Sequence, residues 1–218
     1  MAAGKDKRIV DVNEFEKIRE QVIKDEIGAD WKLAKSFEHT TVYRRTDTDN
    51  RDSIFKFVSK LVGVPVEDGV KLVTDIPLRS RYDKAFTEIK VLDDHKDYKT
   101  VYWYVPLPTP CSDRDLVQHI KVLDDETTRT SFVVALPATH PSAPERPKVV
   151  RAETKMSMSI LRPDEDDSNS CILTTIAQTD MKGLIPEFVI NYALIKSGDD
   201  WRNAMVTFYH DVYVKEKQ

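Results

Sequence analysis

The stretch Val149-Val-Arg-Ala-Glu-Thr-Lys-Met-Ser-Met-Ser-Ile-Leu161 carries the clearest periodicity in the sequence. Its even positions from 150 to 160 are Val, Ala, Thr, Met, Met and Ile, whereas its odd positions from 151 to 159 are Arg, Glu, Lys, Ser and Ser. Alternation with period two gives a β-strand one apolar and one polar face. A long strand of this kind is typical of a curved antiparallel sheet with solvent on one side.

Other strand-like segments lie on both sides of this stretch. The connections at 93–99, 124–128 and 163–169 are charged, and they are too short for the crossover helices that parallel strands require. They therefore favour antiparallel hairpins. The further predicted strands are 31–37, 40–45, 54–61, 85–92, 100–105, 115–123, 131–136 and 171–179.

Helical patterns occur at the two ends of the chain and once between. Residues 11–27 repeat apolar side chains at helical spacing, and 66–73 form a brief helix that ends near Pro77. Pro186 suits the first turn of a final helix, which we expect Gly198-Asp199-Asp200 to interrupt. With no repeat and no Gly/Ser-rich linker, residues 1–218 are predicted to form a single α+β domain.

Composition excludes several classes of protein. The chain has 218 residues, a net charge of −4 and only six glycines, none spaced for a dinucleotide fingerprint or a P-loop. Two cysteines, Cys111 and Cys171, cannot build a disulfide framework. The sequence shows neither a signal peptide nor an apolar run long enough to span a bilayer. A cytoplasmic protein is expected, and a pI of about 5.8 disfavours duplex nucleic acid as a partner.

Recognisable catalytic and metal-binding motifs are missing. The five histidines are scattered, and neither an HExxH nor a GxSxG motif occurs. The acidic segment 164–169 lacks the central Gly and the terminal Glu of an EF-hand loop, so a solvated hairpin tip is the better interpretation. The sequence therefore predicts no cofactor, no metal and no catalytic residues.

Three motifs in order resemble one family. Arg114-Asp-Leu-Val117 follows a Pro-rich segment, Lys148-Val-Val-Arg-Ala-Glu153 starts the long strand, and Asp180-Met-Lys-Gly-Leu-Ile-Pro186 precedes the last helix. Together they resemble the START (StAR-related lipid transfer) domain over residues 30–215. The segment Tyr102–Asp115 is most similar to the phosphatidylcholine-transfer branch of that family.

The resemblance implies a helix-grip fold, in which a curved antiparallel sheet wraps a long C-terminal helix around a hydrophobic cavity. It also implies that residues 105–113, with Pro106, Pro108 and Pro110, form a mobile lid. We expect Gly198 to let the helix shift beside them at a membrane.

Apolar residues are predicted to line the cavity. Burying a lipid chain is favourable by about 0.8 kcal/mol per methylene, which demands a deep and dry site. The apolar face of the long strand and one face of the last helix supply such a lining. The predicted lipid-binding residues are Arg79, Tyr82, Trp103, Leu116, Gln118, Ile120, Met156, Met158, Ile160, Phe188, Val189, Tyr192 and Met205.

The resemblance also ranks the ligands. Arg79, or Arg81 if the register slips, falls where the branch places an arginine for the lipid phosphate, and Trp103 matches the first aromatic of a choline cage. The other cage positions correspond to Leu116 and to Thr175 or Ile176, which are not aromatic. Ile120 stands where the sterol branches place an arginine. A phospholipid is therefore favoured, then another hydrophobic metabolite, then a sterol.

The sequence thus predicts a non-enzymatic protein that binds a lipid and transfers it between membranes through transient contact with their surfaces. The alternative is an enzyme of the wider helix-grip group, such as a cyclase or hydrolase, that uses His119 or Glu153 in the cavity. A lipid-sensing module is a third hypothesis.

Overall fold

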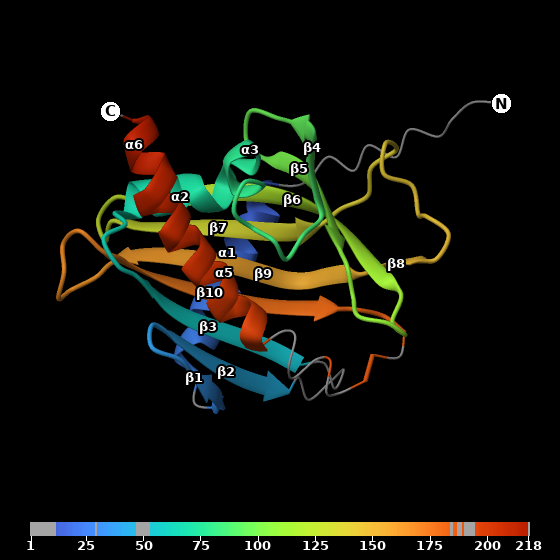
Figure 1. Ribbon diagram of the computed structural model, residues 1–218, viewed down its shortest axis with the longest axis horizontal. Helices are drawn as coiled ribbons and strands as arrows, with labels where there is room; N and C mark the ends of the chain where they lie inside the picture. Colours follow the sequence, from blue (N-terminus) through green and yellow to red (C-terminus); the bar gives the residue numbers. More distant parts are fainter. Residues whose placement is uncertain are drawn as a thin grey trace.

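The computed structural model describes residues 12–28, 30–46, 53–183, 185–186, 189 and 195–217. One large sheet carries helices on both of its faces (Figure 1). The elements are α1 (Val12–Ile27), β1 (Lys32–Ser36), β2 (Thr40–Thr46), β3 (Ser53–Leu61), α2 (Val66–Thr74), α3 (Ile76–Arg79), β4 (Glu88–Asp94), β5 (Lys99–Val105), β6 (Asp113–Asp125), β7 (Thr130–Pro137), β8 (Val149–Arg151), β9 (Glu153–Pro163), β10 (Cys171–Asp180), α5 (Ile195–Phe208), the π-helix η2 (Tyr209–Tyr213) and α6 (Val214–Glu216).

The sheet is almost entirely antiparallel. Its strand order is β1-β2-β3-β10-β9-β7-β6-β5-β4, and the short β8 runs parallel to its partner, β6. Three charged hairpin loops join β4 to β5, β6 to β7 and β9 to β10, as predicted. The predicted α+β class and the antiparallel sheet are therefore confirmed.

The stretch 149–161 forms two strands, and its prediction as one continuous strand was wrong. Ala152 separates β8 from β9, and its N–H donates to the carbonyl of Asp115 at 2.9 Å. β8 pairs with β6, whereas β9 pairs with β7 and β10. The chain changes partners at Ala152, which the alternation of side chains does not reveal.

Helix α1 covers one face of the sheet and lies behind it in Figure 1. Its side chains Phe15 and Val22 are fully buried against the strands. Two turns separate these residues, so both lie on the same side of the helix. The cluster beneath α1 includes Ile54, Phe132, Val134, Met156, Met158, Ile160 and Ile176.

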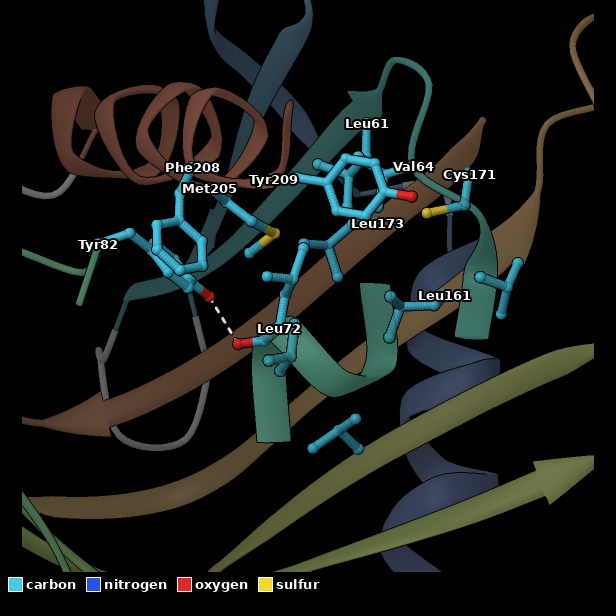
Figure 2. Close-up of a cluster of buried hydrophobic side chains, with 13 residues drawn as sticks. Leu61, Val64, Leu72, Tyr82, Leu161, Cys171, Leu173, Met205, Phe208 and Tyr209 are labelled. Carbon is cyan, nitrogen blue, oxygen red and sulfur yellow. Dashed lines mark hydrogen bonds between the residues drawn. The ribbon is translucent and has the colours of Figure 1, made fainter. Parts of the chain in front are cut away.

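Helices α2, α3 and α5 lie on the opposite face (Figure 1). Figure 2 shows the cluster that joins them to the sheet, in which Met205 and Phe208 of α5 contact side chains from α2, β3, β9 and β10. Tyr82 belongs to the same cluster, and its hydroxyl donates to the carbonyl of Leu72 at 2.7 Å. One end of α5 is thereby fixed against the sheet.

The helix predicted at 66–73 is confirmed as α2, which ends at Thr74, near Pro77. Pro77 itself occupies the first turn of α3, where the lack of an N–H costs nothing. The predicted break of the last helix was wrong. Gly198 does not interrupt α5, which is continuous from Ile195 to Phe208. The expected start of that helix after Pro186 lies largely outside the described residues. No helix in the part of the chain described is long and apolar enough to cross a membrane.

The three sequence motifs hold the fold together at one end of the sheet. Arg114 donates to the carbonyls of Met181 (2.6 Å) and Lys182 (2.8 Å), which fixes the turn after β10. Arg151 donates to both carboxylate oxygens of Asp115, at 2.7 and 3.0 Å, and so joins β8 to β6. These residues act as structural anchors, since none of them lines the cavity described next.

Candidate functional site

A cavity of about 290 Å³ lies between the sheet and α5. Its volume is near the lower end of the range for small-molecule pockets, about 300–1,000 Å³. Strands β3, β5, β6, β7, β9 and β10 supply its floor, and α2, α3, the segment after α3 and α5 supply its walls. The lining residues are Phe57, Ser59, Val73, Arg79, Asp83, Ala85, Phe86, Trp103, Leu116, Gln118, Ile120, Val133, Ala135, Thr154, Ser157, Ser159, Leu173, Thr175, Thr179, Ser197, Gly198 and Trp201.

Arg79 is the cationic side chain of this lining and is surrounded by aromatic rings. Its guanidinium carbon lies 4.7 Å from the ring centre of Trp103, 5.0 Å from that of Trp201 and 5.7 Å from that of Phe86. Cation–π attraction over these distances stabilises the charge in a partly dry site. The aromatic surroundings therefore hold the protein's own cation.

Asp83 neutralises the charge of Arg79 and leaves one nitrogen of the Arg79 guanidinium group available to a ligand. The Nε–H of Arg79 donates to the carboxylate of Asp83 at 2.9 Å, and Nη1 donates to the carbonyl of Val73 at 3.3 Å. Asp83 is 2% exposed, so this carboxylate needs such a partner. Within the described residues no hydrogen bond uses Nη2, which can donate to an oxygen of a ligand.

The floor of the cavity carries hydroxyl groups. The Ser159 and Thr175 hydroxyls lie 3.0 Å apart on neighbouring strands, and the Gln118 amide donates to the Thr154 hydroxyl at 2.7 Å. The residue pairing of β9 and β10 skips Lys155, as in a β-bulge. This extra residue places Thr154 on the same face of β9 as Ser157 and Ser159.

Six of the residues that the sequence singled out line this cavity. They come from α3, β5, β6 and α5, which are distant in the sequence. They are Arg79, Trp103, Leu116, Gln118, Ile120 and Gly198.

Met156, Met158 and Ile160 do not line the cavity, and their placement there was wrong. They belong to the cluster under α1, on the other face of the sheet. The polar positions of the same strand, Ser157 and Ser159, face the cavity instead. The apolar face of β9 was assigned to the ligand because a covering helix on that side could not be inferred from the alternation.

The other predicted positions lie elsewhere. Tyr82 and Met205 pack in the cluster of Figure 2 and are not part of the cavity lining. Val189 is buried but does not belong to the lining either. Phe188 and Tyr192 lie outside the described residues. Arg81 makes a bidentate ion pair with Glu216, at 2.8 and 2.7 Å, so it is not the cavity arginine.

The Pro-rich segment between β5 and β6 does not reach the cavity. Pro106, Pro108 and Pro110 are exposed. Asp113 fixes the base of the segment, because it accepts hydrogen bonds from the Tyr104 hydroxyl (2.7 Å) and the Leu107 N–H (2.9 Å). Its role as a gate remains a prediction.

Three aromatic residues of the site were missed. Phe57, Phe86 and Trp201 lie on β3, on the segment after α3 and on α5. Trp201 lies on the last helix, where the spacing of apolar residues does not separate a cavity residue from a packed one. Only the closeness of all three rings to the cavity reveals them.

The residues of the enzymatic alternative lie away from the cavity. His119 faces the other side of β6, where Thr100 contacts its ring at 3.0 Å and burial, with a smaller effect of His95, lowers its pKa to about 4. Glu153 is exposed and pairs with Lys182. Among the residues that the structure describes, no group of three His, Cys, Asp or Glu could hold a metal ion.

Comparison with known proteins identifies relatives of the whole fold. The family model described as START domain matches residues 23–205. Human phosphatidylcholine transfer protein is 28% identical over 76% of this chain and 77% of its own length. Steroidogenic acute regulatory protein, mitochondrial, of Oncorhynchus mykiss is 30% identical over 62% of this chain, which spans about half (47%) of that protein.

Solved structures show the same architecture. Human StAR-related lipid transfer protein 5 superposes with a TM-score of 0.78 at 20% identity, over 90% of this chain and 97% of the other. Human STARD10 gives a TM-score of 0.76 at 21% identity, over 95% and 84%. The curved antiparallel sheet with its C-terminal helix is therefore the helix-grip fold that the resemblance implied.

Proposed function

The chain belongs to the START domain family, and from this premise we propose that it binds a lipid in the cavity and transfers it between membranes. The observation that supports this most directly is the cavity itself, which lies between α5 and the sheet. Phe57, Leu116, Val133 and Leu173 give it an apolar wall. Such a wall shields hydrocarbon from water at about 0.8 kcal/mol per methylene.

A phospholipid is the favoured ligand class. The free Nη2 of Arg79 suits a phosphate oxygen, because guanidinium groups bind oxyanions through short charge-assisted bonds. The relatives named as phosphatidylcholine transfer proteins support the same class. Choline as the headgroup has less support, since Leu116 and Thr175 offer no aromatic face and Arg79 occupies the space between the rings.

Transfer requires the cavity to open. We propose that the segment 105–113 and α5 move during transient contact with a membrane surface, in the cytoplasm and without nucleic acid as a partner. No catalytic role is proposed, because His119 and Glu153 lie outside the cavity.

The binding proposal is tested by identifying lipids that copurify with the protein and by measuring transfer of fluorescent phosphatidylcholine between vesicles. Ala135→Phe fills the cavity from β7, so we expect it to lower both bound lipid and transfer rate at least tenfold. Glu126→Phe adds the same ring on an exposed turn and serves as the control. Absence of bound lipid and of transfer in the unmodified protein would exclude the function.

Arg79 is tested separately. Arg79→Gln keeps a polar side chain of similar length but removes the charge, so anionic phosphate loses its partner. We expect phospholipid affinity to fall about tenfold or more, the range for a lost charge-assisted bond. Arg81→Gln is the matched control, since its ion pair with Glu216 lies on the surface. Equal affinities of the two variants would show that Arg79 does not contact the headgroup.

A further inference from the structure

The polar part of the cavity floor forms a continuous strip on two neighbouring strands. It consists of Thr154, Ser157 and Ser159 of β9 and Thr175 and Thr179 of β10, all of which line the cavity. Ser159 is paired with Thr175, and Thr154 with Thr179, across the two strands. Cross-strand neighbours lie about 5 Å apart and next-nearest residues along a strand about 7 Å. We call these five residues the hydroxyl strip.

The hydroxyl strip lies in the middle of the sheet and not at its rim. In the strand order, β10 and β9 are flanked by β3 on one side and β7 on the other. The Arg79 side chain contacts the ring of Trp103 on β5, and β6 and β7 separate β5 from β9 in the strand order. We therefore expect a ligand whose headgroup is anchored at Arg79 to place part of its body over the strip.

Part of the hydrogen-bonding capacity of this region is unused. The hydroxyl of Ser157 has no hydrogen-bond partner within the described part of the chain. Gln118 uses its amide N–H on Thr154, and its carbonyl oxygen accepts no hydrogen bond among the described residues. On the adjoining wall, Trp103 is 3% exposed, and its buried indole N–H has no hydrogen-bond partner among the residues that the structure describes.

A fully saturated hydrocarbon chain is a poor match for such a surface. Covering a hydroxyl with methylene groups removes its water and gives it no new partner, which is unfavourable. An oxygen on the ligand, as a hydroxyl or a carbonyl, restores that hydrogen bond. Sites built to bond a ligand hydroxyl discriminate strongly against the analogue that lacks it.

On these grounds we propose that the hydroxyl strip selects lipids whose hydrophobic body carries hydroxyl or carbonyl oxygens, over their unsubstituted counterparts. The inference rests on the proposed lipid-binding function and specifies its ligand class.

The test compares two phosphatidylcholines that share the headgroup and differ only in one acyl chain, stearoyl or hydroxystearoyl, with the hydroxyl moved along the chain in a series of isomers. Affinity and transfer between vesicles are measured for each. We expect the unmodified protein to prefer at least one hydroxystearoyl isomer by tenfold or more, and to show a maximum within the series.

Two variants test whether the hydroxyl strip causes this preference. Ser157→Ala removes a hydroxyl that has no partner in the described part of the chain, so we expect the fold to be preserved. Ser159→Ala combined with Thr175→Val removes both members of a bonded pair and leaves neither unsatisfied. Both changes should reduce the preference to below threefold. Thr174→Val, on the same strand but the opposite face, is the matched control and should retain the preference.

The outcomes separate this inference from the function on which it rests. Equal binding of all acyl isomers, with no change in the variants, would overturn the selectivity and leave lipid transfer intact. Selectivity that persists in both strip variants would also overturn it. If no phospholipid of either kind binds, the proposed function and this inference both fail.

Discussion

The two faces of strand β9 differ in what they contact. On one face Met156, Met158 and Ile160 lie under α1 and are almost completely buried. On the other face Ser157 and Ser159 line the cavity. The apolar face supplies stability, and the polar face lines the proposed ligand site. Even in a START domain, the most regular apolar pattern marks the packed core.

The largest loss of stability is expected from breaking the ion pair between Arg151 and Asp115, on the α1 side of the sheet. Asp115 is 1% exposed, and its principal partner is Arg151. Arg151→Ala leaves a buried carboxylate without its counter-charge, so we expect the free energy of unfolding to fall by about 3–5 kcal/mol in urea titrations. Arg146→Ala, which breaks an exposed pair with Glu88, should cost about 1 kcal/mol or less. Equal losses would contradict the anchoring role.

Adjacent substitutions in β9 test the comparison directly. Met158→Ala leaves a void beneath α1 and should cost about 2–5 kcal/mol of stability. Ser157→Ala removes one atom from the wall of an existing cavity and should change stability by about 0.5 kcal/mol or less. Lipid selectivity should respond in the reverse order. If Ser157→Ala proved as destabilising as Met158→Ala, the two faces would not differ as described.

A substitution at Gly198 extends the comparison to the helix that packs on the cavity side of the sheet. A Cβ at this position would lie 2.3 Å from Cδ1 and 2.5 Å from Cε1 of Phe57, so the glycine permits α5 to approach β3 closely. We expect Gly198→Ala to displace helix or ring and to lower stability by about 1–3 kcal/mol, although alanine favours helices. Ser197→Ala, which adds no atom, is the control. Undiminished stability with slower lipid transfer would instead support the predicted role of Gly198 in gating.

The smallest effect concerns a polar latch between α2 and the C-terminal end of the chain. In it, Asp68 of α2 accepts hydrogen bonds from Tyr209 and Tyr213 of η2 and from Lys217, which follows α6. Burial alone would raise the pKa of Asp68, but hydrogen bonds from Lys217, Tyr209 and Tyr213 together hold it below the ordinary value of 3.8. Because the folded pKa is depressed, the latch is fully stabilising above pH 3.8 and is lost as pH falls through the folded pKa.

Asp68→Asn should therefore lower stability at neutral pH and flatten its decline in acid. Urea unfolding at neutral and acidic pH measures both changes. Asp200→Asn, in an exposed pair with Lys196, provides the comparison. A variant whose stability declines with acid as steeply as that of the unmodified protein would show that the latch contributes no pH dependence.

Local pattern predicted most elements because neighbouring residues determine them. The helix at 11–27 and the hairpin at 163–169 follow from spacing and charge alone. The split at Ala152 was not predictable, since it depends on a hydrogen bond to Asp115 from a distant strand. Taken alone, Gly198 likewise predicted a helix break. In the structure, the close approach of α5 to Phe57 explains why a glycine occupies this position.

The site was predictable in part for the same reason. Arg79, Trp103 and Leu116 were found through the resemblance of motifs, while Trp201 and Phe86 gave no local signal that they would approach Arg79. By itself, the sequence determined that the sheet is antiparallel, how most helices and strands follow one another along the chain, and the family. Which face of that sheet encloses the cavity was decided by the tertiary structure alone. A strand with one apolar and one polar face can bury either, and only the placement of α1 and α5 shows which face is packed and which lines the cavity.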